Sequence, residues 1–208
     1  MSNLEIKKMS KFIVEINEEA TKVFVEGFYE ELLQITKNKS KLIDTFKNSF
    51  NPEQCYIALE DGNIVGMISY SSNRQRGINI SKDEIKKNIG FFKGRKIYKK
   101  LNKECNKSLL INDHMIHIEY LTTLKEHRGK GIAKRLIKHL LDNLNYTEYV
   151  IQFSNDNTEL RKLYSGLGFK EVSRHPEIGR KNKESHLRIN MNKLTVVNKI
   201  HAKEYMMN

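Results

Sequence analysis

The sequence predicts a mixed α+β fold organised as one domain. Three observations indicate this class: strand-like and helix-like hydrophobic patterns alternate along the chain, only two prolines interrupt them, and no internal repeat recurs. A chain of 208 residues is long enough for one globular domain with a sizeable buried core. The 38% hydrophobic share is typical of a folded protein.

The N-terminal region is expected to form a strand and two packing helices. Residues 11–16 have strand character, and Asn17, followed by two glutamates, is a typical helix cap. Apolar residues then recur at helical spacing, namely Ala20, Val23, Phe24, Phe28 and Leu32. A second helix is predicted after the cap Ser40, with the apolar stripe Leu42, Ile43, Phe46 and Phe50.

A β-hairpin follows, and after it comes the least regular part of the chain. Residues 55–60 and 64–70 are β-prone runs separated by the sequence Asp-Gly-Asn, which favours a tight turn. Within residues 71–113, Ser81 and Glu84 have the spacing of a capping box in front of a lysine-rich helical stripe. We interpret this stretch as a helical insertion.

The C-terminal half is expected to alternate strands and helices. Residues 115–124 have strand character, and a glycine loop then leads into a helix with the apolar stripe Ile132, Leu136, Ile137, Leu140, Leu141 and Leu144. Another strand is predicted over residues 149–153, and residues 155–157 begin a further helix.

Two closing strands are predicted over residues 169–174 and 186–192. The predicted domain therefore spans residues 1–192, and residues 193–208 are interpreted as a C-terminal tail.

The formal net charge of +12 is large for this length and attracts anions such as nucleic acid, acidic lipid or a phosphorylated cofactor. A compositional bias toward lysine explains it equally well. No run approaches the roughly 20 apolar residues of a membrane-spanning helix, and the N-terminus lacks the apolar core of a signal peptide. We therefore expect no membrane association and a cytoplasmic location.

Cys55 and Cys105 are the only cysteines in the sequence. They are too few for a disulfide scaffold or a zinc site, and the chain has no CxxC or HExxH motif. We predict no metal site, and we interpret both cysteines as reduced thiols without a catalytic role.

The glycine loop, residues 128–133, places small residues where the predicted strand turns into a helix. Consecutive backbone N–H groups there can approach an anion without obstruction, and the helix dipole adds attraction. A diphosphate fits such a run of amides, with added charge from Arg128 and Lys130. The spacing matches neither a Walker loop nor the dinucleotide-binding GxGxxG motif. The alternative interpretation is a plain glycine turn that caps a helix.

Two spaced segments carry a family signature. Arg128, Gly131 and Ala133 match the pattern Q/R-x-x-G-x-G/A after a strand. Asn157 and Tyr164, followed by a Gly-Phe pair, match the pattern N-x-x-x-x-x-x-Y-x-x-x-G-F. In both segments the chain resembles the GNAT superfamily of acetyl-coenzyme A-dependent N-acetyltransferases, in which the first pattern is the cofactor signature.

The resemblance implies a GNAT-like central sheet that is mostly antiparallel, flanked by helices, and splayed between two strands near residues 118–124 and 149–153. The opening would admit the pantetheine arm of acetyl-CoA. The implied reaction is acetyl transfer to a primary amine by direct attack in a ternary complex, with backbone amides near residues 121–123 stabilising the oxyanion. The implied cofactor-binding residues are Leu121, Thr122, Thr123, Arg128, Gly129, Lys130, Gly131, Ile132, Ala133 and Asn157.

Two candidates for the catalytic base precede the glycine loop. An amine with the pKa of lysine is almost fully protonated at neutral pH, so a base or a water chain must remove a proton before attack. His117 and Glu119 are two residues apart and therefore project to one face of the strand. The family commonly places its base on this strand, and the two residues compete for the role. The plainer interpretations are a half-buried histidine and a carboxylate that only orients a cationic substrate.

Tyr164 matches the position at which the family protonates the leaving thiolate of coenzyme A. A phenol within hydrogen-bond reach can serve as this acid. Without the resemblance, Tyr164 would be interpreted as a core residue on the apolar stripe that it shares with Leu160 and Leu163.

Two other functions compete with catalysis. A basic nucleic-acid-binding protein is suggested by the net charge and by the lysine-rich residues 93–107, although no nucleic-acid-binding motif is present. A coenzyme A-binding regulator without turnover is the other alternative. No motif identifies the amine acceptor, which is either a small molecule or a protein, and none indicates an oligomeric state.

Overall fold

The computed structural model describes residues 3–12, 16–107, 109, 111–155, 157–176 and 187–194. In this part of the chain, seven strands form one sheet in the order β1-β2-β3-β4-β5-β7-β6. Neighbouring strands are antiparallel except for β4 and β5, which are parallel. The strands are β1 (Leu4–Lys8), β2 (Cys55–Glu60), β3 (Asn63–Ser71), β4 (Met115–Thr123), β5 (Glu148–Ser154), β6 (Lys170–Pro176) and β7 (Leu187–Leu194). The helices are α1 (Ile16–Gly27), α2 (Tyr29–Leu32), α3 (Lys39–Phe46), α4 (Lys82–Ile89), α5 (Phe91–Leu101), α6 (Ile132–Asn143) and α7 (Thr158–Gly166). Short 3-10 helices occupy Met9–Lys11, Pro52–Gln54 and Lys125–His127, and a π-helical turn, η3, spans Asn102–Asn106.

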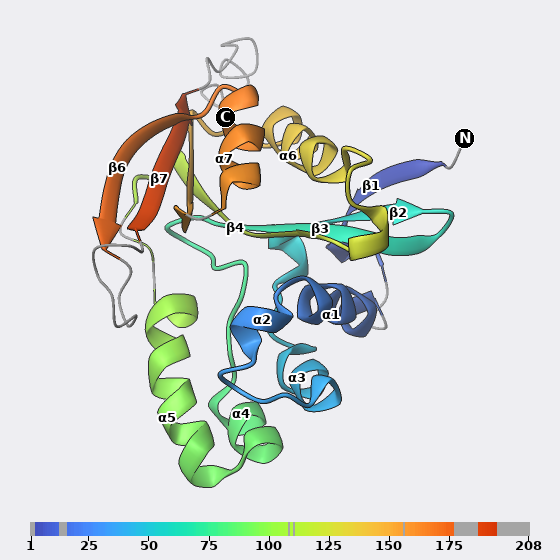
Figure 1. Ribbon diagram of the computed structural model, residues 1–208, viewed down its shortest axis with the longest axis vertical. Helices are drawn as coiled ribbons and strands as arrows, with labels where there is room; N and C mark the ends of the chain where they lie inside the picture. The colour runs from blue at the N-terminus through green and yellow to red at the C-terminus, as the bar shows by residue number, and fades with distance from the viewer. Residues whose placement is uncertain are drawn as a thin grey trace, which may run out of the picture.

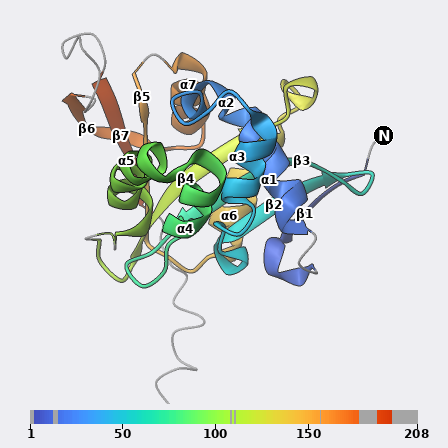
Figure 2. The same cartoon turned by 90° about the horizontal axis from the view of Figure 1, so that it is seen from below.

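Helices cover both faces of the sheet, so the predicted α+β class is confirmed (Figure 1). Helices α1 to α5 lie on one face, and Figure 2 shows α1, α3, α4 and α5 in front of the sheet from that side. Helices α6 and α7 lie on the other face. Each face has its own apolar core, one centred on Phe24, Phe46 and Ile57, the other on Ile118 and Leu136. Among the described residues, no helix is long and apolar enough to cross a membrane.

The predicted hairpin is confirmed as β2 and β3. Its turn contains Asp61 and Gly62, both with positive φ, at 49° and 83°. Consecutive residues with positive φ match the right-handed twist of the flanking strands, which explains why the Asp-Gly sequence is favoured here.

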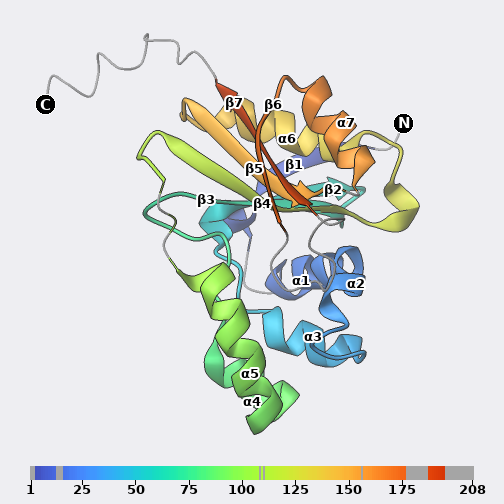
Figure 3. The same cartoon turned by 60° about the vertical axis from the view of Figure 1, so that its left-hand side comes forward.

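The irregular region after the hairpin contains α4, α5 and η3. The Ser81 hydroxyl accepts a hydrogen bond from Glu84 N at 3.3 Å, so the predicted cap of α4 is confirmed. Figure 3 shows α4 and α5 side by side, projecting from the sheet on the side of α3. That this region is an insertion into a GNAT-like domain stays a prediction.

The prediction for the N-terminus was wrong. The first strand is β1, at Leu4–Lys8, and it is followed by a 3-10 helix at Met9–Lys11. Of the strand predicted over residues 11–16, Lys11 is in this 3-10 helix and Ile16 begins α1, while residues 13–15 lie outside the described part of the chain. The reason is a long-range contact, because β1 pairs along its whole length with β2, about 50 residues later. Helix α1 already begins at Ile16, so Asn17 lies inside it rather than capping it.

Two further boundaries differ from the prediction. The cap of α3 is Asn38, whose side chain accepts from Lys41 N at 3.0 Å, rather than Ser40. Strand β7 continues to Leu194, two residues into the predicted tail, whereas residues 195–208 lie outside the described part of the chain.

Candidate active site

Strands β4 and β5 separate from each other halfway along β4 (Figure 3). Parallel pairing joins residues 115–118 to residues 148–151 and stops there. On its other edge, β4 remains paired with β3 as far as Thr123. The β5-facing edge of residues 119–123 therefore presents backbone groups that no neighbouring strand of the described chain occupies. Such an edge can pair with an extended ligand as an added strand would.

A β-bulge lies in β4 where the two strands separate. Ser69 of β3 faces two residues of β4, Glu119 and Tyr120, and its hydroxyl accepts from Tyr120 N at 3.3 Å. A bulge changes the direction of the side chains around it. The Tyr120 ring accordingly packs edge-on against Phe24 and Phe28 of α1, with ring centroids 5.4 and 5.6 Å away.

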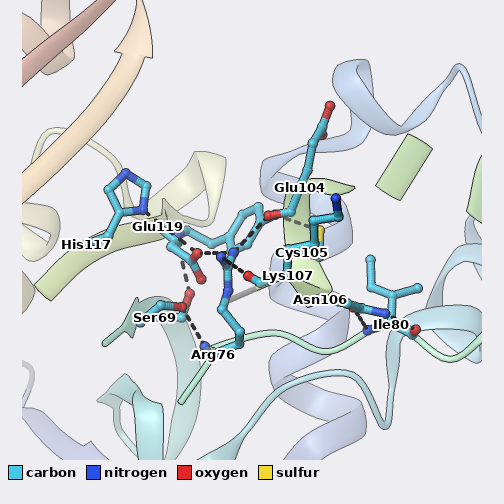
Figure 4. A network of polar contacts seen from close by, with 12 residues as sticks. Ser69, Arg76, Ile80, Glu104, Cys105, Asn106, Lys107, His117 and Glu119 are labelled. Atoms are coloured by element: carbon cyan, nitrogen blue, oxygen red, sulfur yellow. Dashed lines mark hydrogen bonds and ion pairs between the residues drawn. The ribbon is translucent and has the colours of Figure 1, made fainter. Parts of the chain in front are cut away.

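His117 and Glu119 lie together on the face covered by α1 to α5, as the spacing predicts (Figure 4). His117 Nδ1 is 3.8 Å from Glu119 Oε1, which is too long for a hydrogen bond but close enough for an ion pair. The Glu119 side chain is only 6% exposed and that of His117 is 25% exposed.

Arg76, which sequence reasoning missed, binds Glu119 directly (Figure 4). Its Nη2 is 2.5 Å from Glu119 Oε1 and also donates to the carbonyl oxygen of Glu104 at 2.8 Å. Its Nη1 donates to the carbonyl oxygen of Lys107 at 3.0 Å. The Arg76 side chain is 12% exposed. It follows β3 in a loop without any motif, so no sequence signal connected it with Glu119.

Several polar atoms of this network have no hydrogen-bond partner among the described residues. They are His117 Nδ1, Glu119 Oε2 and Arg76 Nε, and all three are buried. Buried polar atoms are normally hydrogen-bonded, and unpaired ones point to water or a ligand. The geometry therefore suits the binding of a polar or cationic group at this position.

Both glycines of the glycine loop adopt a left-handed backbone conformation. Gly129 and Gly131 adopt φ values of 77° and 76°, a region that other residues rarely adopt. A Cβ atom built on either glycine meets nothing within 4 Å, so the space beside both is open. Gly131 caps α6, and no side chain of the described chain hydrogen-bonds to the first amides of that helix. These amides therefore remain available to an anion.

The basic side chains around the loop lie close to oxygen atoms of the protein. Arg128 Nε donates to the carbonyl oxygen of Thr123 at 3.2 Å and thereby links the loop to the end of β4. Lys130 Nζ and His127 Nδ1 lie 3.5 and 2.6 Å from Glu60 Oε2. That Arg128 and Lys130 add charge for a diphosphate stays a prediction.

Tyr164 lies on α7 between the aromatic rings of Phe153 and Phe169, with centroids 5.9 and 5.1 Å away. Its ring is fully buried, and burial raises the pKa of its phenol above the usual value. The hydroxyl oxygen has no hydrogen-bond partner in the part of the chain that is described. Tyr164 thus packs in the core with its polar end left without a partner there, and its role as the acid stays a prediction.

The remaining predicted cofactor residues lie at the end of β4 and at the first residues of α6 and α7. Thr122 and Thr123 are buried at the end of β4, and Leu121 packs with the core under α6. Ile132 and Ala133 form the first turn of α6. Asn157 caps α7, since its side chain accepts from Leu160 N at 3.0 Å. This cap gives Asn157 a structural role that the family pattern did not indicate.

A basic groove of about 430 Å³ runs between α6 and the end of α7. Lys134, Lys138 and Lys193 contribute its positive charge, and Asp142 is the acid among them. The groove follows α6 from Lys134 to Asp142, and its side chains carry a net positive charge.

The two cysteines are buried thiols. Cys55 and Cys105 are both nearly inaccessible, and burial raises the pKa of Cys105 to about 11. Cys105 Sγ lies 3.5 Å from the Tyr120 hydroxyl. A thiol with a raised pKa is a poor nucleophile at neutral pH, which argues against a covalent acyl-cysteine. Within the described residues, no three His, Cys, Asp or Glu side chains cluster as metal ligands.

Comparisons with known proteins agree with this geometry. A segment of 65 residues is 34% identical to the human protein N-acetyltransferase 8B, covering 30% of this chain and 29% of that protein. A crystal structure of an N-acetyltransferase from Staphylococcus aureus Mu50 has a TM-score of 0.60 at 16% identity, covering 91% of this chain and all of that one. The NatC complex bound to Gag peptide and CoA matches with a TM-score of 0.52 at 14% identity, over 93% of this chain and 99% of that chain.

The family model for the acetyltransferase (GNAT) family matches residues 13–169. This range contains the separated strands, the bulge, the glycine loop and Tyr164. The two structural matches are too distant in sequence to indicate more than the fold, but that fold is the GNAT-like one that the motifs imply. The match over most of its length shows that this chain belongs to the GNAT family of acetyltransferases.

Proposed function

We propose that the protein transfers an acetyl group from acetyl-CoA to a primary amine by direct attack in a ternary complex. The observation that carries this proposal is the unpaired edge of β4, which leads directly into the glycine loop and the free N-terminus of α6. An extended arm with a diphosphate at one end fits this combination of an edge and an amide cradle.

The residues around the loop fit acetyl-CoA as the cosubstrate. The open space beside Gly129 and Gly131 leaves the amides of residues 129–133 accessible to the diphosphate. The exposed β4 edge offers N–H and C=O groups to the two amides of the pantetheine arm. Acetyl-CoA supplies an activated acyl group, and a backbone N–H near residues 121–123 would donate to the oxyanion that forms.

The proposed reaction needs two proton transfers, one from the acceptor ammonium and one to the leaving thiolate. On the face covered by α1, the pair His117 and Glu119 would take the proton of the acceptor ammonium, a role supported by their proximity to each other. On the opposite face, the Tyr164 hydroxyl is a donor without a partner in the described protein and would protonate the departing thiolate to yield coenzyme A. The acceptor belongs to the class of small-molecule or protein amines.

A thermal-shift titration with acetyl-CoA, beside ADP and a short RNA at low and high salt, tests this proposal. Specific binding to the folded state raises the melting temperature. We expect a rise with acetyl-CoA that persists at high salt, followed by thiol release from acetyl-CoA when a panel of primary amines is supplied.

The other outcomes separate the competing functions. A response to RNA alone that disappears at high salt would instead indicate binding to a phosphate backbone. A rise with acetyl-CoA without thiol release from any amine of the panel would favour a coenzyme A-binding regulator.

A further inference from the structure

Arg76 links the helical region after β3 to strand β4, which carries His117 and Glu119. Its guanidinium contacts the carbonyl oxygens of Glu104 and Lys107, at the end of η3, and the carboxylate of Glu119 on β4 (Figure 4). A planar guanidinium can satisfy several acceptors at fixed angles, so this contact fixes the orientation of the carboxylate as well as its charge.

The ion pair argues against Glu119 as the group that takes the acceptor's proton. Both side chains are largely withdrawn from water, with exposures of 12% and 6%. If Glu119 accepted a proton in each turnover, the Arg76 cation would be left in a poorly hydrated place without its counter-charge. Leaving one member of a buried pair uncompensated is strongly unfavourable.

His117 is better suited than Glu119 to accept a proton from the acceptor. It is the more exposed of the two, so a proton that it accepts can pass to water. Its Nδ1 faces Glu119 Oε1 at 3.8 Å, while the other ring nitrogen points away from the carboxylate (Figure 4). In the neutral ring with its proton on Nδ1, the second nitrogen has a lone pair that can accept a proton. The imidazolium that then forms is stabilised by the neighbouring Glu119 carboxylate.

We propose that Arg76 is a positioning residue that holds Glu119 as the charged partner of His117, so that the imidazole of His117 is the base of the reaction. This inference rests on the proposed acetyl transfer. The imidazole lone pair takes a proton from the acceptor ammonium, and the electron pair of the broken N–H bond stays on the amine nitrogen. That pair then forms the C–N bond at the thioester carbonyl, and the C–S bond breaks with its electron pair on the coenzyme A sulfur. The sulfur takes the proton of the Tyr164 hydroxyl, and the second proton of the attacking nitrogen returns through water to the Tyr164 oxygen.

The charges around His117 make the inference testable. On the neighbouring strands, His117 is in register with Ser71 of β3 and Val150 of β5, which are uncharged. Glu148 of β5 lies on the same face as Val150, and its carboxylate accepts a hydrogen bond from Asn192. Among the described residues, Glu119 is therefore the ionic contact of the ring, and Arg76 acts on the ring through Glu119.

The first experiment follows the titration of the His117 ring by NMR, with the signal assigned by its loss in His117→Gln. In Arg76→Met the Glu119 carboxylate is no longer shared with a cation, so the midpoint should move to higher pH. In Glu119→Gln the guanidinium is left without its partner beside the ring, so the midpoint should move to lower pH. Arg74→Met is the matched control, since Arg74 lies in the same loop with 79% exposure, and it should leave the midpoint unchanged. None of these readouts requires turnover, so they survive a failure of the proposed function.

The second experiment measures kcat/KM against pH with an active acceptor. The acidic limb of the profile should move to higher pH in Arg76→Met and to lower pH in Glu119→Gln. In His117→Gln the limb should disappear, and kcat should fall by about 10²-fold or more. Loss of the limb in Glu119→Gln together with its retention in His117→Gln would overturn the assignment. An unchanged His117 titration in Arg76→Met would overturn the positioning role.

A double variant guards against loss of the fold. Arg76→Met combined with Glu119→Gln removes both charges and leaves neither uncompensated. We expect it to fold even where a single variant does not, with a His117 midpoint between those expected for the single variants. A midpoint in the folded double variant that lies above or below both expected values would contradict the proposed coupling.

Discussion

At the scale of single residues, the unpaired hydroxyl of Tyr164 separates a catalytic role from a structural one. A buried hydroxyl without a partner lowers stability by about 1–3 kcal/mol. Tyr164→Phe should therefore preserve or raise the free energy of unfolding. If Tyr164 protonates the thiolate, the same change should lower kcat by about 10²-fold with little effect on the affinity for acetyl-CoA. Denaturant unfolding and steady-state kinetics on one preparation measure both quantities.

Tyr149 provides the matched control for that substitution. It is also fully buried, but its hydroxyl donates to the carbonyl oxygen of Leu144 at 2.7 Å. Tyr149→Phe should cost about 1 kcal/mol of stability, since one hydrogen bond is lost, and should leave kcat unchanged. If the two variants respond alike in both measurements, Tyr164 is a core residue without a role in the chemistry.

At the scale of elements, the junction between the glycine loop and α6 should bind the diphosphate through its backbone. Gly131→Val would place a branched side chain beside the amides and would force a β-branched residue into the left-handed region. We expect the affinity for coenzyme A, measured by calorimetry, to fall about tenfold or more, since a hydrogen bond to a charged group contributes about 1.5–3 kcal/mol.

Gly62 separates the backbone effect of this change from its effect on binding. Its φ of 83° and its open surroundings are similar to those of Gly131, but it lies in the β2–β3 turn. Gly62→Val should lose a similar amount of stability and keep its affinity for coenzyme A. An equal loss of affinity in both variants would attribute the effect to folding and not to the amide cradle.

The elements that the sequence predicts correctly are those that local chemistry determines. The Asp61-Gly62 turn, the Ser81 cap and the glycine loop each depend on residues only a few positions apart. Strand β1 was misplaced because its stability comes from pairing with β2, far away in the chain. Arg76 was missed for the same reason, since its partner Glu119 is 43 residues away and no periodicity or spacing connects them.

At the scale of the whole molecule, β4 is a strand that packs against helices on both faces of the sheet. Its residues alternate between the core under α6 and the face under α1, and the bulge at Glu119 and Tyr120 lies within this alternation. Under the proposed function, β4 would therefore join a cofactor surface on one face to an acceptor surface on the other. The fold and the glycine loop followed from sequence patterns, whereas the network of His117, Glu119 and Arg76 depends on contacts made only in the folded chain.

Gly27, at the end of α1, packs directly against Thr122 of β4. A Cβ atom built on Gly27 would lie 1.7 Å from Thr122 Oγ1 and 2.6 Å from Thr122 Cβ, and Thr122 is itself buried. Gly27→Ala should therefore force α1 away from β4 and lower the free energy of unfolding by about 1–3 kcal/mol. The face of β4 that α1 covers also carries His117. We therefore expect the displacement of α1 to raise the KM for the amine acceptor more than the KM for acetyl-CoA.

Gly166 of α7 is the matched control for this prediction, since it is also helical and a Cβ built on it meets nothing within 4 Å. Gly166→Ala should be neutral or stabilising by up to about 1 kcal/mol, because alanine favours the helix. Denaturant unfolding of both variants, followed by kinetics, makes the comparison. If Gly27→Ala is as stable as Gly166→Ala, α1 and β4 are not packed as closely as described, and the acceptor surface does not depend on that contact.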